Sequence, residues 1–362
     1  MTILFLILGL VLLVVGAEAL VRGASKIAAG IGISPLIIGL TVVAFGTSSP
    51  ELAVSIMSSM SGNVDIAVGN VVGSNIFNIL FILGLAAIIT PLVVAQQLLW
   101  VDVPITIGAS FLMLIMGLNG QISRVEGLIL FIILIAYNIF LIRKSKKERS
   151  VLVKLEYETE YGNGTKYDWK FWLINNVLII IGLALLLLGS RWLVDSATTI
   201  ARSLGVSDLI IGLTIVAAGT SMPEVATSVI ASLRGERDIA VGNAIGSCIF
   251  NILAVLGISA LVAPGGIPVS AAAIHFDLPI MIASAVACLP IFFTGHRIVR
   301  WEGFILFAYY IFYTIYLVLS SAQHSLLQLF DNAILWFVLP LTVMTIIISV
   351  VNALRNGNPA IK

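Results

Sequence analysis

Glycine, proline, hydroxyl and acidic residues interrupt a long apolar stretch near the start of the chain, at residues 44–53 (AFGTSSPELA). Pro50 has no amide hydrogen and clashes with the carbonyl four residues earlier, so it breaks a helix. In hydrocarbon, the carbonyls freed near Ala44 and Thr47 each cost several kcal/mol unless they find a partner. A cation is one such partner, and the hydroxyls of Thr47 and Ser48 would add hard oxygen ligands.

Glu51 follows this break by one residue, although a carboxylate at membrane depth costs roughly 2.5–3.5 kcal/mol even on a lenient insertion scale. The pattern returns at residues 217–224 (AAGTSMPE), with Glu224 as the acid. The corresponding oxygens there come from Ala217, Thr220 and Ser221. Two carboxylates that meet near the midplane could not both stay ionised without a cation between them. With no His or Cys nearby, the pattern predicts an oxygen cage for a hard ion such as Ca²⁺, Na⁺ or Mg²⁺.

Each break is followed by a second apolar segment with further oxygen-bearing side chains. These lie four residues apart, on one helix face, as the pairs Ser74 with Asn78 and Ser247 with Asn251. The same segments carry G-x-x-x-G pairs, Gly69 with Gly73 and Gly242 with Gly246. Such pairs predict close helix packing, which would bring the Ser/Asn face near the carboxylate.

The composition is that of a membrane protein. Hydrophobic residues make up 60% of the 362 residues, charged residues only 10%, and the mean hydropathy is +1.13; soluble domains have about 25% charged residues. Apolar runs of about 20 residues predict helices that span a bilayer, and the alternation typical of a β-barrel is missing. The sequence has no basic face of the kind that would indicate nucleic-acid binding. Cys248 and Cys288 lie in apolar runs and are expected as small core residues.

Eleven spans are expected from this hydropathy pattern. They cover residues 2–29, 34–60, 66–90, 98–118, 125–142, 171–201, 207–232, 239–262, 275–294, 301–320 and 332–353. No Lys or Arg precedes Arg22, so the first run is expected to be a retained helix rather than a secretory signal. The polar, basic segment 143–170 follows the fifth span and is expected to be cytoplasmic. That placement puts the N-terminus outside and the C-terminus in the cytoplasm.

The chain repeats itself with an offset of 173 residues, as the alignment of Glu51 with Glu224 illustrates. Because each copy holds five spans, an odd number, the copies must lie in opposite orientations. The predicted fold is an all-α polytopic membrane protein with two inverted five-helix repeats, ten spans, plus one extra C-terminal transmembrane helix. The units are residues 1–142, the cytoplasmic loop 143–170, residues 171–320 and the tail 321–362.

Several charged residues near span ends are expected to have structural roles. Glu18 and its aligned residue Arg191 are expected to pair or to reach the interface. Asp102 and Asp277 precede prolines and are expected at helix starts, where the helix dipole favours an acid.

The two motifs resemble the sodium/calcium exchanger family of the cation/calcium antiporter superfamily. The family core, G-T-S-x-P-E followed by G-N-x-x-G-S-x-x-x-N, is matched by GTSSPE with GNVVGSNIFN and by GTSMPE with GNAIGSCIFN. The resemblance covers about the first 320 residues. It implies that Glu51 and Glu224 are the central Ca²⁺ ligands. It also implies backbone oxygens from Thr47, Thr220, Ala44 and Ala217, with the shells completed by Ser48, Ser221, Ser74, Ser247, Asn78 and Asn251. Potassium-dependent relatives have aspartate where Asn251 stands, so K⁺ dependence is not expected.

The resemblance implies an antiporter that exchanges Na⁺ for Ca²⁺ by alternating access and exports Ca²⁺, not an enzyme. Its partners are expected to be Ca²⁺ and Na⁺ as substrates and the lipid bilayer, with no cofactor, nucleic acid or obligate protein partner. A prokaryotic plasma membrane is the expected location. Exchange of H⁺ for Ca²⁺, or of Na⁺ for another divalent cation, is the main alternative. An ion channel and an intramembrane hydrolase are disfavoured, the first by the duplication within one chain and the second by the lack of a His or Lys base near the motifs.

Overall fold

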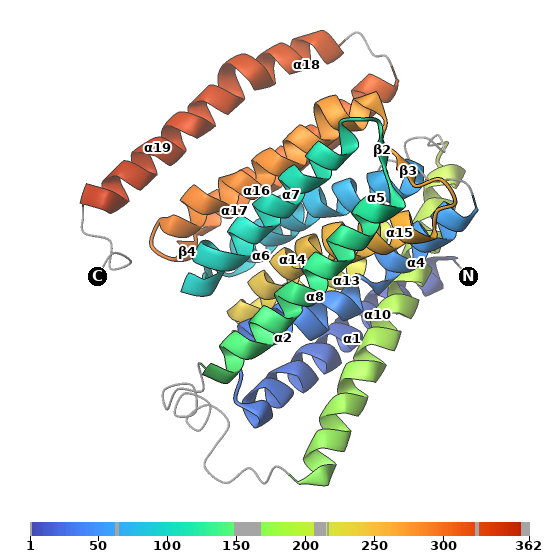
Figure 1. Ribbon diagram of the computed structural model, residues 1–362, viewed down its shortest axis with the longest axis vertical. Coiled ribbons are helices and arrows are strands. Elements are labelled where there is room, and N and C mark those ends of the chain that lie inside the picture. The colour runs from blue at the N-terminus through green and yellow to red at the C-terminus, as the bar shows by residue number, and fades with distance from the viewer. Residues whose placement is uncertain are drawn as a thin grey trace.

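The computed structural model describes residues 2–61, 65–147, 168–205, 215, 217–322 and 326–355. Figure 1 shows long helices bundled side by side, with the C-terminal helices at the edge of the bundle. Helices suit this apolar chain because every backbone hydrogen bond is made within the segment, where lipid offers no partner. Most of the predicted loop 143–170 lies outside the described residues.

The first half of the chain contains the elements up to residue 147. In order they are α1 (Thr2–Ile31), α2 (Pro35–Ile38), η1 (Gly39–Val43), α3 (Ala44–Thr47), α4 (Ser49–Met60), α5 (Asp65–Ile76), η2 (Phe77–Leu83), α6 (Gly84–Ile89), β1 (Leu92–Val93), η3 (Leu98–Asp102), α7 (Val103–Gly117), β2 (Gln121–Ile122) and α8 (Arg124–Lys147). The η elements are π-helical turns, a form that often occurs at functional sites.

The described elements of the second half follow the same order as their counterparts in the first half. They are α10 (Trp169–Ser203), α12 (Ala217–Gly219), α13 (Met222–Leu233), α14 (Arg237–Phe250), η5 (Asn251–Leu256), α15 (Gly257–Val262), β3 (Ile267–Pro268), η6 (Ala273–Asp277), α16 (Leu278–Phe293), β4 (Arg297–Ile298) and α17 (Arg300–Ser321). Three further elements follow, α18 (Leu327–Ala333), η7 (Ile334–Val338) and α19 (Leu339–Arg355).

The described helices confirm a multi-pass membrane protein. Nine of them are long and apolar enough to cross a bilayer, and ten if the pair 35–47 and 49–60, bent by 44°, is one span. The α13 helix is apolar but shorter. It forms the end of the predicted span 207–232, of which residues 207–214 and 216 lie outside the described part of the chain.

Contacts between the halves occur in reciprocal pairs. Gly9 of α1 packs on Gly189 of α10, and Gly16 packs on Gly182, so the two helices cross antiparallel at glycines. A Cβ atom at Gly9 or at Gly16 would lie 2.8 Å from the facing carbonyl oxygen, so only glycine allows the backbones to approach this closely. Since an offset of 173 converts Gly9 into Gly182 and Gly16 into Gly189, each of these two contacts is the repeat-related copy of the other.

The same reciprocity extends to the other elements. Gly84 of α6 packs on Gly303 of α17, while Gly257 of α15 packs on Gly127 of α8. The short strands pair antiparallel across the halves, β1 with β4 and β2 with β3. Figure 1 places β4 at one end of the bundle and β2 with β3 at the other. In the repeat, α6 corresponds to α15 and α8 to α17. The contact of α6 with α17 therefore corresponds to the contact of α15 with α8, and the strand pairs correspond in the same way.

The centre of the bundle is formed by the helices that carry the G-x-x-x-G pairs. Their spans, Ile66–Ile89 and Arg237–Val262, are 72% and 83% buried, the highest values among the described spans. A Cβ at Gly246 would lie 2.7 Å from the Cα of Leu40, so the predicted close packing is present in the second half. Gly69 and Gly73 have no such neighbour among the described residues, and the repeat-related segment 209–217 lies largely outside them.

The C-terminal helices pack on the outside of the bundle (Figure 1). The hydroxyl of Tyr309 in α17 donates to Thr342 Oγ1 in α19 at 2.8 Å. The candidate span Leu327–Thr345 has none of its residues buried. The described side chains of this extra helix therefore lie outside the interior that holds the two breaks.

Candidate cation site

Both predicted breaks occur, and they have the same geometry. Ser48 separates α3 from α4 with φ −82° and ψ 8°, and Ser221 precedes α13 with φ −89° and ψ 9°. These angles lie in the sparsely populated bridge region, where many active-site residues are found. Pro50 and Pro223 lie in the first turn of the following helix, where a missing amide hydrogen is harmless. Glu51 and Glu224 occupy that same turn.

The protein itself satisfies part of the backbone that the breaks expose. The Ala44 carbonyl accepts the Ser48 amide at 3.0 Å and also accepts, at a longer 3.4 Å, the hydroxyl of Thr47. The Gly219 carbonyl, four residues before Pro223, accepts a hydrogen bond from the hydroxyl of Ser190 in α10 at 2.6 Å. Ser190 could not be predicted from the repeat, because its aligned residue in α1 is Ala17.

Each carboxylate receives a hydroxyl from the opposite half. Ser48 Oγ donates to Glu224 Oε1 at 2.8 Å, and Ser221 Oγ donates to Glu51 Oε1 at 2.7 Å. Since Ser221 lies only one helical turn before Glu224, the two carboxyl groups converge on one region. The expected meeting of Glu51 and Glu224 across the halves is therefore present, and the exchange of serines is a detail that the motifs did not predict.

The serines of the second helices join the same cluster. Ser74 Oγ lies 3.3 Å from Ser221 Oγ, and Ser247 Oγ donates to Glu224 Oε1 at 3.4 Å. Asn78 and Asn251 lie one turn further along, at the start of the π-helical turns η2 and η5. All four side chains are buried, as the spacing of the Ser/Asn pairs led us to expect.

Five buried oxygen atoms of the predicted ligands have no hydrogen-bond partner among the described residues. They are Glu51 Oε2, Glu224 Oε2, Asn78 Oδ1, Asn251 Oδ1 and Thr220 Oγ1. Leaving a buried polar atom unpaired is costly, and carboxylates most of all. These oxygens match the chemistry of a hard cation, since Ca²⁺ takes about six to eight oxygen ligands. The described residues contain no group of three or more His, Cys, Asp or Glu side chains that could hold a metal, so the set depends on hydroxyl and amide oxygens.

The predicted ligands are enclosed by protein. Glu51, Glu224, Thr47 and Ser48 have no exposed surface, and Thr220 is half-buried. Ala44, Ser221, Ser74, Ser247, Asn78 and Asn251 are also buried. Ala217 begins the short helix α12, and its side chain lies outside the description. Most of the predicted ligands whose side chains the structure describes are therefore shielded from solvent, and Thr220 is the half-buried exception.

Two asparagines that were not predicted as site residues form hydrogen bonds at the helix breaks. Asn70 Nδ2 donates to the Glu51 carbonyl at 3.1 Å and to Ser55 Oγ at 2.9 Å. Its counterpart Asn243 donates to the Glu224 carbonyl at 3.4 Å and accepts from Thr47 Oγ1 at 3.0 Å. Both asparagines could have been identified from the sequence, because each lies four residues before a Ser/Asn pair.

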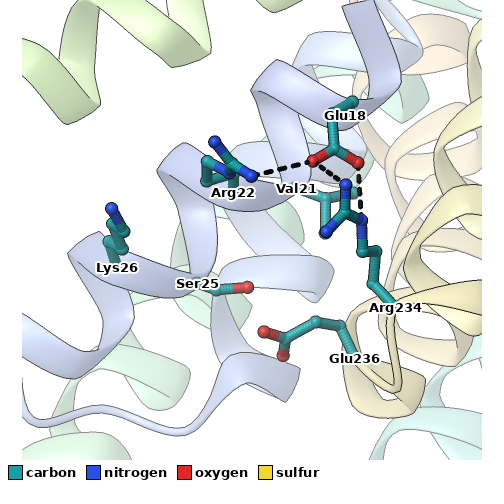
Figure 2. Close-up of a pocket in the computed structure, with 7 residues that line it drawn as sticks. All are labelled: Glu18, Val21, Arg22, Ser25, Lys26, Arg234 and Glu236. Carbon is teal, nitrogen blue, oxygen red and sulfur yellow. Dashed lines mark hydrogen bonds and ion pairs between the residues drawn. The ribbon is translucent and has the colours of Figure 1, made fainter. Parts of the chain in front are cut away.

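A polar pocket at the far end of α1 is separate from the cluster (Figure 2). Glu18 pairs with Arg22 at 3.5 Å and accepts from Arg234 Nε at 2.7 Å, which links α1 to the end of α13. The aligned residues Arg191 and Asp195 also pair, at 3.9 Å, with the two signs exchanged. The expected pairing of Glu18 is present, but Glu18 lies near the middle of α1 rather than at a span end.

The bundle and its interior together define a polytopic membrane protein with an enclosed, oxygen-rich site built from two repeated helix breaks. Comparison with known proteins identifies the class more narrowly. The family "Sodium/calcium exchanger protein" matches residues 1–143 and 174–319.

Similar proteins agree with that match. The sodium/calcium exchanger MaX1 of Methanosarcina acetivorans is 34% identical over 347 residues, covering 87% of this chain and 97% of the relative. The inner membrane protein YrbG of Escherichia coli is 38% identical over 287 residues, covering 78% and 87%. A structure of the sodium-calcium exchanger NCX_Mj superimposes with a TM-score of 0.73 at 31% identity, covering 86% of this chain and 96% of that one.

The chain belongs to the sodium/calcium exchanger family. It is therefore a cation antiporter of the membrane and not an enzyme, and the ions it moves are its substrates rather than cofactors. The resemblance inferred from the two motifs is confirmed.

Proposed function

We propose that the protein exchanges Na⁺ for Ca²⁺ and exports Ca²⁺, with Glu51 and Glu224 as the central ligands. The observation that carries this proposal is the set of unpaired buried oxygens, which includes one oxygen from each carboxylate. Two carboxylates match the charge of one Ca²⁺. Ca²⁺ and Na⁺ are both hard cations that accept oxygen ligands, so one cage can hold either. The names of MaX1 and NCX_Mj support this choice of ions.

The remaining predicted ligands are assigned by their place in the cluster. Asn78, Asn251 and Thr220 offer unpaired oxygens, and Ser48, Ser221, Ser74 and Ser247 surround the carboxylates. Backbone oxygens of Ala44, Ala217, Thr47 and Thr220 complete the set.

The coupling of Na⁺ transport to Ca²⁺ transport follows from the unfavourable free energy of the cation-free site. Two facing carboxylates in a low dielectric repel each other and lose their hydration, so the cation-free carrier is disfavoured and does not return uncoupled. If Ca²⁺ and Na⁺ share both carboxylates, the binding of one displaces the other. Sliding of α1 and α10 together against the rest of the bundle would then expose the cluster to each side in turn, and their glycine crossing supports movement as one unit.

The reciprocal contacts between the halves support the inverted ten-span repeat, with the last helix as an addition. Placing basic ends in the cytoplasm orients it. Arg22, Lys26 and Arg234 gather at one pocket (Figure 2), and α8 ends and α10 begins at that same end of the bundle (Figure 1). We therefore assign this end to the cytoplasm of a prokaryotic cell, with the N-terminus outside and the C-terminus inside.

Flux measurements in proteoliposomes test the proposal. Vesicles loaded with Ca²⁺ are placed in a Na⁺, K⁺ or H⁺ gradient, each imposed alone, and the release of Ca²⁺ is followed. The proposal requires release in the Na⁺ gradient only. Release of Ca²⁺ in a proton gradient without Na⁺ would indicate H⁺/Ca²⁺ exchange instead. Single-channel currents in planar bilayers would exclude a carrier mechanism and indicate a channel.

A further inference from the structure

Asn251 differs from the carboxylates of the cluster because only one end of its side chain can bind a cation. An amide carries an acceptor oxygen at one end and an NH₂ donor at the other. If the group turns over, it presents hydrogens where the ion needs an oxygen. An aspartate at the same position has two equivalent oxygens and needs no such orientation.

A neighbouring asparagine fixes the orientation of this amide. Asn251 Nδ2 donates to Asn75 Oδ1 at 3.2 Å, while Asn251 Oδ1 has no partner among the described residues. Both side chains are buried, Asn75 near the end of α5 and Asn251 at the start of η5. The amide therefore directs its nitrogen to Asn75 and leaves its oxygen for the cluster.

Asn75 is itself oriented by a group that can only accept. Its Nδ2 donates to the thioether sulfur of Met281 in α16 at 3.5 Å, and a thioether sulfur has no hydrogen to donate. The Asn75 backbone carbonyl lies 3.8 Å from the thiol of Cys248. Since Met281 receives the NH₂ end of Asn75, the Oδ1 end must face Asn251.

The repeat does not reproduce this arrangement. An offset of 173 aligns Asn75 with Cys248, so the second half offers a thiol where the first half offers an amide. Asn78, the counterpart of Asn251, accordingly faces the Cys248 thiol instead of an amide oxygen, and neither of its amide atoms has a conventional hydrogen-bond partner among the described residues. The two asparagines of the cluster are therefore unequal, and the inequality arises from the single difference between GSNIFN and GSCIFN.

We propose that Asn75 is a positioning residue, which holds the Asn251 amide with its oxygen toward the transported cation. This inference rests on the proposed function, since it requires a cation at the cluster. It predicts that removing the Asn75 amide weakens cation binding without slowing the transport cycle. The loss should vanish where residue 251 is an aspartate.

The experiment compares Asn75→Ala, Asn251→Asp and the double variant with wild type, in proteoliposome flux at graded Ca²⁺ and Na⁺. We expect Asn75→Ala to raise the half-saturating cation concentration roughly 3- to 10-fold, the range for one neutral hydrogen bond, with the maximal rate within about twofold. In the Asn251→Asp background the same substitution should change the half-saturating concentration less than about twofold. Cys248→Ala is the matched control, because it removes a buried side chain at the aligned position and leaves the Asn251 amide held.

The outcomes separate orientation from packing. If Asn75→Ala weakens cation affinity equally in both backgrounds, or if Cys248→Ala weakens it by the same amount, Asn75 has a packing role and the inference is wrong. The inference is also wrong if Asn75→Ala leaves the half-saturating cation concentration unchanged. Met281→Leu provides a second variant if Asn75→Ala does not fold, because it removes the sulfur acceptor at similar volume and should shift affinity in the same direction. The wild type alone tests the proposed function. The Asn75 inference is tested by the ratio of variant to wild type, measured with whichever cation the wild type carries.

Discussion

Replacing Glu224 by glutamine should abolish cation binding while making the cation-free protein more stable. Glutamine keeps an oxygen that can accept from Ser48 and Ser247, which now donate to Glu224 Oε1 at 2.8 and 3.4 Å. The fold therefore loses no hydrogen bond there. What the site loses is one of two buried negative charges.

The size of each effect follows from electrostatics. At about 4 Å and an effective dielectric of about 20, one carboxylate attracts a cation by about 4 kcal/mol per unit of cation charge. Since each 1.4 kcal/mol is a factor of about ten, affinity should fall by roughly a thousandfold or more. The cation-free protein should gain about 1–4 kcal/mol, because an uncompensated buried charge has been removed.

Thermal unfolding of detergent-solubilised protein measures both effects together. With Ca²⁺ at about 100 times its dissociation constant, wild-type protein should be stabilised by about 2.7 kcal/mol. Glu224→Gln should unfold at a higher temperature than wild type without Ca²⁺ and should not respond when Ca²⁺ is added. Glu51→Gln should behave like Glu224→Gln, because in the wild type Ser221 donates to the Glu51 carboxylate as Ser48 donates to that of Glu224.

Glu18→Gln is the control, because Glu18 forms its ion pairs with Arg22 and Arg234, outside the cluster. It should respond to Ca²⁺ as wild type does. The reasoning fails if both central variants still gain the full stabilisation from Ca²⁺, or if both are destabilised without it, since the carboxylates would then serve the fold rather than the ion.

Three further predictions follow from the same contacts. Ser48→Ala and Ser221→Ala should each weaken Ca²⁺ binding by roughly tenfold or more, the value of a hydrogen bond to a charged group, as isothermal titration calorimetry would measure. Gly219→Ala should lower the melting temperature more than Gly46→Ala, because the new methyl meets a stiff β-branched valine of α10 at 2.3 Å rather than the end of a flexible leucine at 2.5 Å. Arg234→Ala should change the free energy of unfolding by only about 0.2–1 kcal/mol in denaturant titrations, because its ion pair is exposed to solvent.

The repeat and the chemistry of the breaks could be predicted from the sequence because both are local. Proline, glycine and the acid fix the break within six residues, and the 173-residue offset identifies its copy. Lateral contacts could not be predicted, because they depend on how helices from distant parts of the chain rotate against each other. Ser48 was expected in the cluster, but nothing local indicated that it serves Glu224 rather than Glu51.

Asp102 and Asp277 illustrate the same limit. Both were expected at helix starts, but each ends a π-helical turn, η3 or η6, that runs directly into α7 or α16. Neither acid therefore lies at a free helix start, and neither side chain caps the helix that follows. Asp102 instead accepts from Tyr137 at 2.9 Å, and Asp277 accepts from Tyr313 at 3.0 Å. These tyrosines lie 35 and 36 residues further on, so only the packing of α8 and α17 brings them to the acids.

The exchange of serines explains why the site needs both halves. Each carboxylate lies on one repeat, and its shortest hydroxyl contact comes from the other, so the opposite half contributes directly to holding each acid in place. A movement that separates the halves near Ser48 and Ser221 would break both contacts together and weaken the ligand set. Under the proposed function, a cation held by both carboxylates would oppose that separation, because it would use the oxygens that the serines leave unpaired. Cation binding and contact between the halves at Ser48 and Ser221 would then be coupled, as an obligatory exchanger requires.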